Sequence, residues 1–273
     1  MKKILGILSL GIVCFTWGSA QEEIVLEGTY QGSNLFVQNP FSSSGVGFCV
    51  VNVTINGQQS IDEINSSAFE IDFSSYQLLR GTPVEVKIEY KNECSPTVLN
   101  SDVLKPTSTY EISSMSITPD GLLSFSTTNE SGELPFLIEQ KRWNKWIKVA
   151  SVKGKGTSGK NQYSVRLKPH SGKNTFRIKQ VDFTKKVNLS PEKRLIKSSV
   201  KEVFIGNENP MRITETLTFK DDTGNETSTM YEIFNRQAQI VKTGYGSKVD
   251  LTGLGKGDYF LNFDNKTQVI KKI

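Results

Sequence analysis

The 273-residue chain contains one histidine and three cysteines, which leaves little material for a metal site built from these side chains. General bases of the commonest kind are equally scarce. The 22 glycines and nine prolines are not gathered in one tract, which excludes a low-complexity or wholly disordered chain. No long stretch has helical periodicity, and beyond the N-terminus no apolar run reaches the ~20 residues of a membrane-spanning helix. We therefore expect a non-enzymatic protein without a cofactor, a metal or a transmembrane segment.

The N-terminus has the pattern of a signal peptide. Lys2 and Lys3 precede an apolar run over residues 4–17, and small residues follow at 18–20. Cleavage after Ala20 is expected, so residues 1–20 would be removed on export across the inner membrane. The mature protein would then reside in the periplasm, on the outer-membrane surface or in the medium.

Two cysteines, Cys49 and Cys94, remain after this cleavage. In an oxidising compartment such a pair can form a disulfide, which would stabilise the fold by about 3–4 kcal/mol for a loop of this length. Alternatively, Cys49 is a buried free thiol within the apolar run 48–51. Spacing does not decide between the two.

Short alternating runs separated by turn residues dominate the mature chain. Residues 50–55 alternate strictly and end at Asn56-Gly57, and residues 83–90 alternate in the same way. This pattern is typical of antiparallel sheets packed as sandwiches. With a length that suggests two or three compact units, it predicts an all-β chain of three consecutive Ig-like or fibronectin-like β-sandwich domains.

The charge is strongly divided along the chain. Residues 21–125 carry 13 acidic and 4 basic side chains, residues 126–197 carry 5 and 17, and residues 198–273 carry 10 of each. The formal charges are therefore −9, +12 and 0. Either the acidic and basic units attract one another, or the basic unit binds an anionic partner, or the lysines are a solvated surface.

Five strands are expected in the middle of the chain, at 122–125, 135–140, 146–149, 163–167 and 174–182. With these strands the segment resembles a fibronectin type III domain of exported Bacteroidetes proteins, which implies a β-sandwich over residues 113–197. The preceding segment, 21–112, is loosely similar to transthyretin-like or carboxypeptidase-regulatory sandwiches through residues 68–72 and 82–86. The remaining residues, 198–273, would form the third domain.

Three catalytic motifs fail on inspection. Residues 154–161 have the spacing of a phosphate-binding P-loop but lack the following Ser or Thr and a helix, so we expect a flexible hairpin loop. Asp222-Thr223-Gly224 matches the aspartic-protease signature only once, within a run of turn formers. His170 lies beside a serine in a predicted turn, and adjacency alone makes no Ser–His pair.

Aromatic and basic residues alternate in the segment 141–148. Arg142, Trp143 and Lys145 are candidates for a patch that binds an anionic ligand such as lipopolysaccharide or another surface glycan. In a fibronectin-like sandwich one such tryptophan packs into the core, so we expect Trp146 to point inward and Trp143 to be exposed.

Four segments of the last 75 or so residues, 230–235, 239–242, 249–261 and 269–273, contain a leucine turn, a Lys-Gly pair, a tyrosine that begins the next strand, and a basic terminal strand. With these features the tail resembles the C-terminal sorting domain of type IX secretion substrates in Bacteroidetes. The sorting-domain motif maps onto these residues: Asn209, Pro210, Tyr231, Leu254, Lys256, Gly257, Tyr259, Lys271 and Lys272.

The segment departs from the family pattern at three places. The leading Tyr-Pro-Asn-Pro pattern is reduced to Asn209-Pro210, Ala238 replaces a turn glycine, and Asp258 replaces the valine that follows Lys-Gly. Gly257 is expected at a turn or bulge. An ordinary Ig-like end domain without a transport role is the alternative.

The resemblance implies an exported protein of the type IX secretion pathway, with the translocon or its signalling components as partners. A cell-surface module that binds a glycan or lipopolysaccharide is the alternative function. No motif supports an enzyme, and no nucleic-acid partner is expected.

Overall fold

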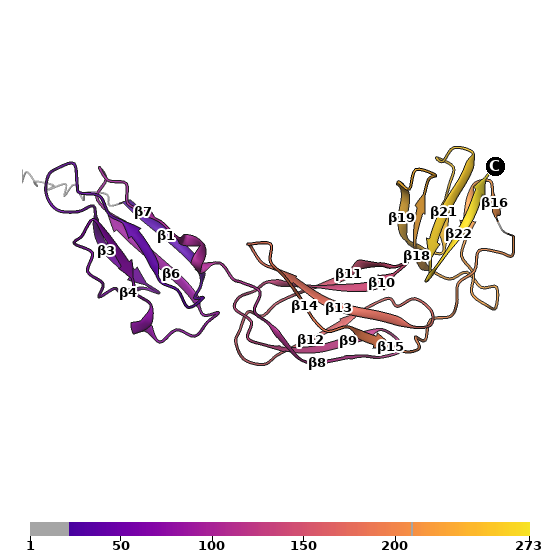
Figure 1. Ribbon diagram of the computed structural model, residues 1–273, viewed down its shortest axis with the longest axis horizontal. Coiled ribbons are helices and arrows are strands. Elements are labelled where there is room, and N and C mark those ends of the chain that lie inside the picture. Colours follow the sequence, from indigo (N-terminus) through magenta and orange to yellow (C-terminus); the bar gives the residue numbers. More distant parts are fainter. Residues whose placement is uncertain (1–21, 209) are drawn as a thin grey trace, which may run out of the picture. The chain divides into compact units, whose positions relative to one another are not determined.

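The computed structural model describes residues 22–208 and 210–273, which form strands, turns and two short 3-10 segments, η1 (Ser74–Tyr76) and η2 (Ser101–Leu104) (Figure 1). The predicted all-β fold is confirmed. The signal peptide expected at residues 1–20 and the motif residue Asn209 lie outside the described residues. In the described ranges, no helix has the length and apolar character needed to cross a membrane.

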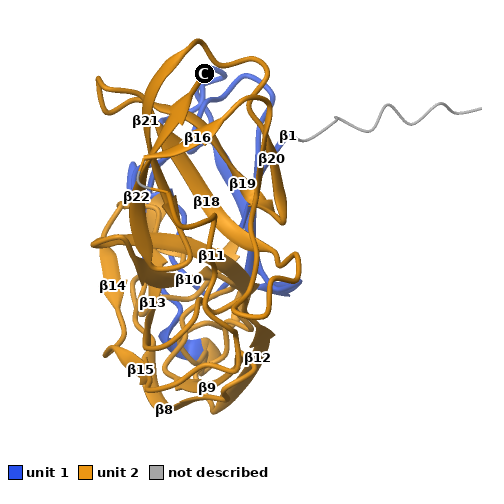
Figure 2. Cartoon of the chain, turned by 90° about the vertical axis from the view of Figure 1, so that its right-hand side faces the viewer, with its two compact units in different colours: residues 1–27, 34–75, 84–101 blue, residues 28–33, 76–83, 102–273 orange. Residues whose placement is uncertain are grey.

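The chain divides into two compact units (Figure 2). One comprises residues up to 27 together with 34–75 and 84–101, and we call it the N-terminal unit. The other comprises residues 28–33, 76–83 and 102–273, so the second and third predicted sandwiches share a unit. The boundaries expected at 112/113 and 197/198 remain predictions.

The N-terminal unit contains two antiparallel sheets, with strand orders β1-β6-β3-β4 and β5-β2-β7. Every second residue of a strand points into its core: Val84, Val86 and Ile88 of β6 are buried, and the residues between them are more accessible. The strands are β1 (Glu22–Thr29), β2 (Leu35–Gln38), β3 (Val50–Ile55), β4 (Gln58–Gln59), β5 (Ala68–Ile71), β6 (Pro83–Tyr90) and β7 (Thr97–Val98).

The middle sandwich has a three-stranded sheet, β12-β9-β8, and a second sheet, β11-β10-β13-β14, in which β15 also pairs with β13. Every strand expected from the fibronectin resemblance has a counterpart, and the sandwich fold is fibronectin III-like. The strands are β8 (Glu111–Ile117), β9 (Leu122–Thr128), β10 (Pro135–Arg142), β11 (Lys145–Lys153), β12 (Asn161–Arg166), β13 (Asn174–Val181), β14 (Val187–Leu189) and β15 (Lys193–Leu195).

The segment between β11 and β12 is not the expected hairpin loop. The two strands belong to different sheets, so residues 154–160 cross from one layer of the sandwich to the other. The crossing is anchored, because the amide of Gly156 donates to Glu130 Oε2 at 2.8 Å. Turn-forming composition identified the loop but did not reveal which strands it joins.

The C-terminal sandwich consists of a five-stranded sheet, β16-β22-β21-β18-β19, and a two-stranded sheet, β17-β20. Within the described residues, none of its strands forms a ladder with the middle sandwich. The strands are β16 (Met211–Ile213), β17 (Thr216–Thr218), β18 (Thr229–Phe234), β19 (Ile240–Gly246), β20 (Lys248–Asp250), β21 (Gly257–Phe263) and β22 (Lys266–Lys272).

The two sandwiches of the second unit have separate hydrophobic cores. Phe136, Phe176 and Tyr163 belong to the core of the middle sandwich. Phe219 and Phe263 belong to the core of the C-terminal sandwich. Each sandwich therefore buries its own apolar side chains.

Candidate functional site

Three of the sorting-motif residues serve the core of the C-terminal sandwich. Tyr231 is buried in β18, and Leu254 and Tyr259 pack against the same cluster. The Tyr259 hydroxyl also donates to the carbonyl of Gly255 at 2.9 Å, which closes the turn before β21. These residues shape the domain and offer little side-chain surface to a partner.

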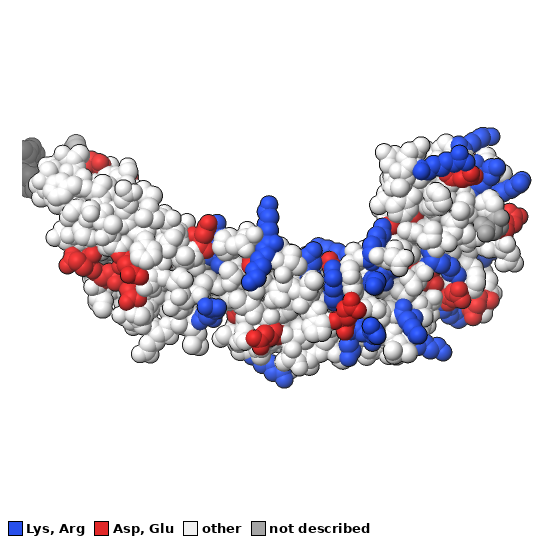
Figure 3. Space-filling view, viewed as in Figure 1, with Lys and Arg blue, Asp and Glu red and all other residues white. Residues whose placement is uncertain are grey.

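The motif's basic residues come together at one end of the five-stranded sheet. In the β21–β22 ladder, Gly257 is opposite Lys272 and Asp258 is opposite Lys271. Lys256 immediately precedes this pair and is exposed, as is Lys271, whereas Lys272 is half-buried. The space-filling view shows Lys and Arg side chains gathered at this C-terminal end (Figure 3).

Strand β16 adds a further cation that the sequence analysis missed. Arg212 is exposed and is opposite Lys271 in the parallel β16–β22 ladder. We call Arg212, Lys256, Lys271 and Lys272 the basic corner. Pro210, which the resemblance assigns to the start of the sorting-domain motif, is exposed just before β16.

Backbone conformation accounts for two positions in the motif. Gly257 has φ +147°, a conformation that other residues rarely adopt, so the glycine after Lys256 is a steric requirement. Ala238, where the resemblance predicts a turn glycine, has φ +60° in the β18–β19 turn. The left-handed conformation is kept at this turn although the residue disfavours it.

Arg142 cannot serve in the predicted anion-binding patch, because it is only 2% exposed. Its guanidinium donates to Gln140 Oε1 at 2.7 Å, to the Lys168 carbonyl at 2.8 Å and to the Asp264 carbonyl at 3.3 Å. Burial lowers the pKa of Arg142 to about 10, so it remains charged at neutral pH. The residue joins the middle sandwich to the C-terminal sandwich.

Lys145 likewise has an internal partner. Its ammonium group is 2.5 Å from Glu232 Oε2 of β18 and 5.2 Å from the centroid of the Phe234 ring. The patch expected from Arg142, Trp143 and Lys145 is therefore corrected: two of its three residues bridge the sandwiches of the second unit.

The expected orientations of the two tryptophans are also corrected. Trp146 is opposite Lys141, an exposed residue of β10, so it lies on the outer face of the sheet. The Arg177 guanidinium is 4.2 Å from the Trp146 ring centroid. Trp143 occupies the β10–β11 turn with φ +49° and is half-buried rather than exposed.

A third polar contact between these sandwiches involves the side chain of Asp264, which the sequence analysis did not single out. Its carboxylate accepts from the amide and the hydroxyl of Ser171 at 2.8 and 2.5 Å. The neighbouring His170 is 2% exposed and hydrogen-bonds the Ser171 carbonyl through Nδ1 at 2.6 Å. Chiefly through burial, the pKa of His170 is lowered below 6.5, so the ring is neutral at pH 7.

A buried carboxylate network stabilises the opposite end of the middle sandwich. The Tyr163 hydroxyl is 2.7 and 2.9 Å from the two carboxylate oxygens of Glu130, and Thr127 donates to the same group. Burial, together with this hydrogen bond, raises the pKa of Tyr163 above its usual value. The network holds the crossing loop 154–160 in place. No motif in the sequence predicted this network.

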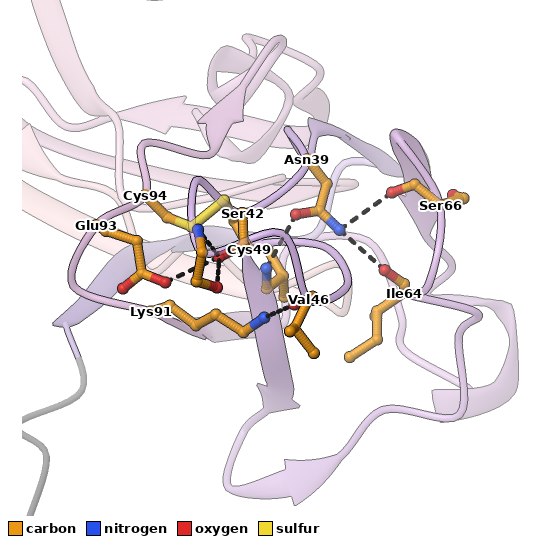
Figure 4. Close-up of a disulfide and its surroundings, with 11 residues drawn as sticks. Asn39, Ser42, Val46, Cys49, Ile64, Ser66, Lys91, Glu93 and Cys94 are labelled. Carbon is orange, nitrogen blue, oxygen red and sulfur yellow. Dashed lines mark hydrogen bonds between the residues drawn. A yellow bond between two sulfur atoms is a disulfide. The ribbon is translucent and has the colours of Figure 1, made fainter.

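The two remaining cysteines are bonded to each other. Cys49 and Cys94 form a disulfide with Cα atoms 5.5 Å apart (Figure 4). The Ser42 hydroxyl donates to Glu93 Oε1 at 2.8 Å, and the Lys91 ammonium donates to the Val46 carbonyl at 2.5 Å. The bond and these contacts tie the loop before β3 to the end of β6.

The aspartic-protease-like tripeptide is part of a turn, as predicted. Asp221 Oδ1 accepts from the amides of Thr223 and Asn225 at 2.9 and 3.0 Å. The Thr223 hydroxyl also donates to Asp221 Oδ1 and has the largest effect. Together these hydrogen bonds lower the pKa of Asp221 to about 2. In the part of the chain that the structure describes, no cluster of three or more His, Cys, Asp and Glu side chains could hold a metal.

No protein-family model matches this sequence, and no curated protein matches it. Among solved structures, a tetra-tandem repeat from the extending region of a large adhesion protein is 15% identical over 92% of this chain and 73% of its own, with a TM-score of 0.32. Fibronectin(III)-like modules of CbhA from Clostridium thermocellum are 12% identical over 60% and 93%, with a TM-score of 0.22. Chicken CNTN1 FN1–FN3 domains are 9% identical over 93% and 97%, with a TM-score of 0.27.

Proposed function

We propose that this chain is an exported, non-enzymatic protein of the type IX secretion pathway, whose C-terminal sandwich is recognised by the secretion machinery. The observation that carries the proposal is the basic corner. In the basic corner, Lys256 precedes Gly257, which has a positive φ and lies opposite Lys272 of the terminal strand β22. These residues belong to a sandwich that has its own core. A surface of this kind can be recognised by shape and charge without unfolding.

The chain is proposed to act as an accessory or signalling component, similar to the small tail-bearing component called PorA, rather than as enzymatic cargo. This role rests on the resemblance of the tail, because a β-sandwich fold by itself does not imply a function. In this role the C-terminal sandwich is bound by its partner and need not be cleaved.

The test follows the full-length protein in a Bacteroidetes host with and without a functional type IX translocon. Cell fractionation and intact mass would report its location and whether residues 198–273 are retained. We expect the location or the associated proteins to change when the translocon is disabled. Identical location, mass and associated proteins in the two strains would contradict the proposal.

A matched pair of variants tests the basic corner itself. Lys271→Ala combined with Lys272→Ala should reduce translocon-dependent recognition, because it removes two of the four cations. Lys220→Ala combined with Lys248→Ala removes the same charge from exposed lysines elsewhere in this sandwich and should have no effect. Equal loss in both variants would show that only net charge matters.

Binding of a surface glycan or lipopolysaccharide by the middle sandwich is the second candidate function. It is favoured by the excess of 17 basic over 5 acidic side chains in residues 126–197. Retention on immobilised lipopolysaccharide that weakens as salt rises would support it, since exposed charges are screened by ions. No retention at low salt would exclude it.

A further inference from the structure

A polar cavity of about 170 Å³ lies in the second unit beside the turn that joins β10 and β11. Its lining includes Lys141, Trp143, Asn144, His170, Lys173 and Asn265, and no carboxylate is among the lining residues. A pocket with this lining favours an anion, and it has room for a group much larger than one water molecule.

One lining group has an unmet hydrogen-bonding requirement. Trp143 Nε1 is buried, and no described residue accepts a hydrogen bond from it. A buried donor without an acceptor is costly, and in native proteins such groups usually bind a water molecule or a ligand. Trp143 lines the cavity, but its Nε1 is not accessible from it in this structure, so a group bound there would accept from the indole N–H only after the ring shifts.

The charges of the two cavity lysines are not neutralised by a carboxylate of the described residues. Within residues 22–208 and 210–273, neither Lys141 nor Lys173 forms an ion pair, whereas Lys145 is paired with Glu232 and Lys179 lies 3.8 Å from Glu139. Two unpaired ammonium groups beside an orphan N–H donor provide the charge and the hydrogen bonds that an oxoanion requires.

We propose that this cavity binds a tetrahedral oxoanion, phosphate or sulfate, held by the ammonium groups of Lys141 and Lys173 and by the indole N–H of Trp143. The group can be a free ion or a substituent of a polysaccharide. This inference is independent of the proposed role in secretion, because its site lies away from the basic corner.

The outer face of the sheet beside the cavity is suited to an extended anionic chain. Lys141 of β10 belongs to this face. So does Glu139, which pairs with Lys148 of β11 on one side and with Arg177 of β13 on the other. Glu139 forms an ion pair with Arg177 at 2.7 Å. Because this one carboxylate is set against Lys141, Lys148 and Arg177, the net charge of these four residues is positive. A polysaccharide whose substituent occupies the cavity would continue along these cations.

Two NMR probes report directly on the cavity. Residues 21–273 contain two tryptophans, Trp143 and Trp146, and one histidine, His170. Inorganic phosphate or sulfate, added at constant ionic strength, should shift the Trp143 indole N–H signal saturably and leave that of Trp146 unmoved. Trp146→Phe assigns the two signals.

The variants separate the cavity from the general positive charge. Lys141→Gln combined with Lys173→Gln should weaken the ion's affinity at least about tenfold, a loss of ~1.4 kcal/mol, whereas Lys148→Gln should leave it unchanged. Unfolding temperatures confirm that each variant is folded. The proposal is overturned if no saturable shift occurs, or if the double variant binds as tightly as the parent.

A second arm identifies the source of the oxoanion. Chondroitin sulfate and its desulfated backbone are titrated against the full mature chain and the same variants. Binding of the sulfated polymer that is lost in the double variant supports the site and assigns a polysaccharide substituent. Binding of the inorganic ions alone supports the site and assigns a free ion. Polymer binding that depends on Lys148 but not on Lys141 and Lys173 would overturn the proposal.

Discussion

The carboxylate of Asp264 accepts two hydrogen bonds from Ser171, at 2.8 Å from the amide and 2.5 Å from the hydroxyl, although 93 residues separate them in sequence. Asp264 lies between β21 and β22, and Ser171 lies in the loop before β13. Since the two sandwiches have separate cores and share no strand ladder in the described chain, contacts of this kind hold them together. The C-terminal sandwich is thus joined to its neighbour without being interwoven with it.

Asp264→Ala should lower the free energy of unfolding by about 1–3 kcal/mol, because two part-buried donors of Ser171 lose a charged acceptor. Urea denaturation of the full mature chain measures this change. Asp258→Ala is the control: it removes a carboxylate from an ion pair with Arg236 at the surface and should cost about 0–1 kcal/mol. Equal costs for the two variants would contradict the role given to Asp264.

His170 should titrate below 6.5, chiefly because it is buried. Arg142 also lowers this pKa, Asp264 raises it, and the ammonium groups of Lys141 and Lys173 line the same cavity. Since the folded-state pKa is depressed, the associated stability is complete above pH 6.5 and is lost as pH falls through the folded-state pKa. Proton NMR of this single histidine, in a buffer free of phosphate and sulfate, measures the value. A pKa at or above 6.5 would show that burial does not dominate the titration of this ring.

The strands of the middle sandwich were predictable because their apolar residues alternate, as in β13, where buried and more accessible positions follow one another throughout. The role of Arg142 was not predictable from local pattern. A basic residue beside Trp143 suggests a surface, but its burial depends on Asp264, 122 residues later. Periodicity reports which face of a strand a residue occupies and does not report which distant loop covers the end of that strand.

The turn at Ala238 shows the opposite case, in which sequence alone identified a departure and the structure explains it. Alanine at φ +60° is disfavoured, so Ala238→Gly should stabilise the protein by about 0.5–1 kcal/mol after the extra flexibility of glycine in the unfolded chain is included. The control is Ala68→Gly in β5, where the same change should destabilise by about 0.5–1 kcal/mol. Thermal unfolding distinguishes these opposite signs, and destabilisation by both changes would contradict the prediction.

The disulfide should contribute about 3–4 kcal/mol to the N-terminal unit, because it closes a loop between residues separated by 45 positions. Cys49→Ala combined with Cys94→Ala should lose this contribution, measured by chemical denaturation without reductant. Adding reductant to the parent should lower its stability towards that of the double variant and leave the variant unchanged. A parent that reductant does not destabilise would argue against the bond or its energetic importance.

The central proposal is that residues 198–273 form a folded label recognised by the export machinery. The most direct measurement is the amount of a periplasmic reporter captured or delivered when this segment is fused to its C-terminus, in Bacteroidetes cells with and without a working type IX translocon. We predict translocon-dependent capture or surface delivery that falls when Lys271 and Lys272 are both changed to alanine. A folded fusion protein that stays in the periplasm without associating with the translocon, in both strains, would contradict it.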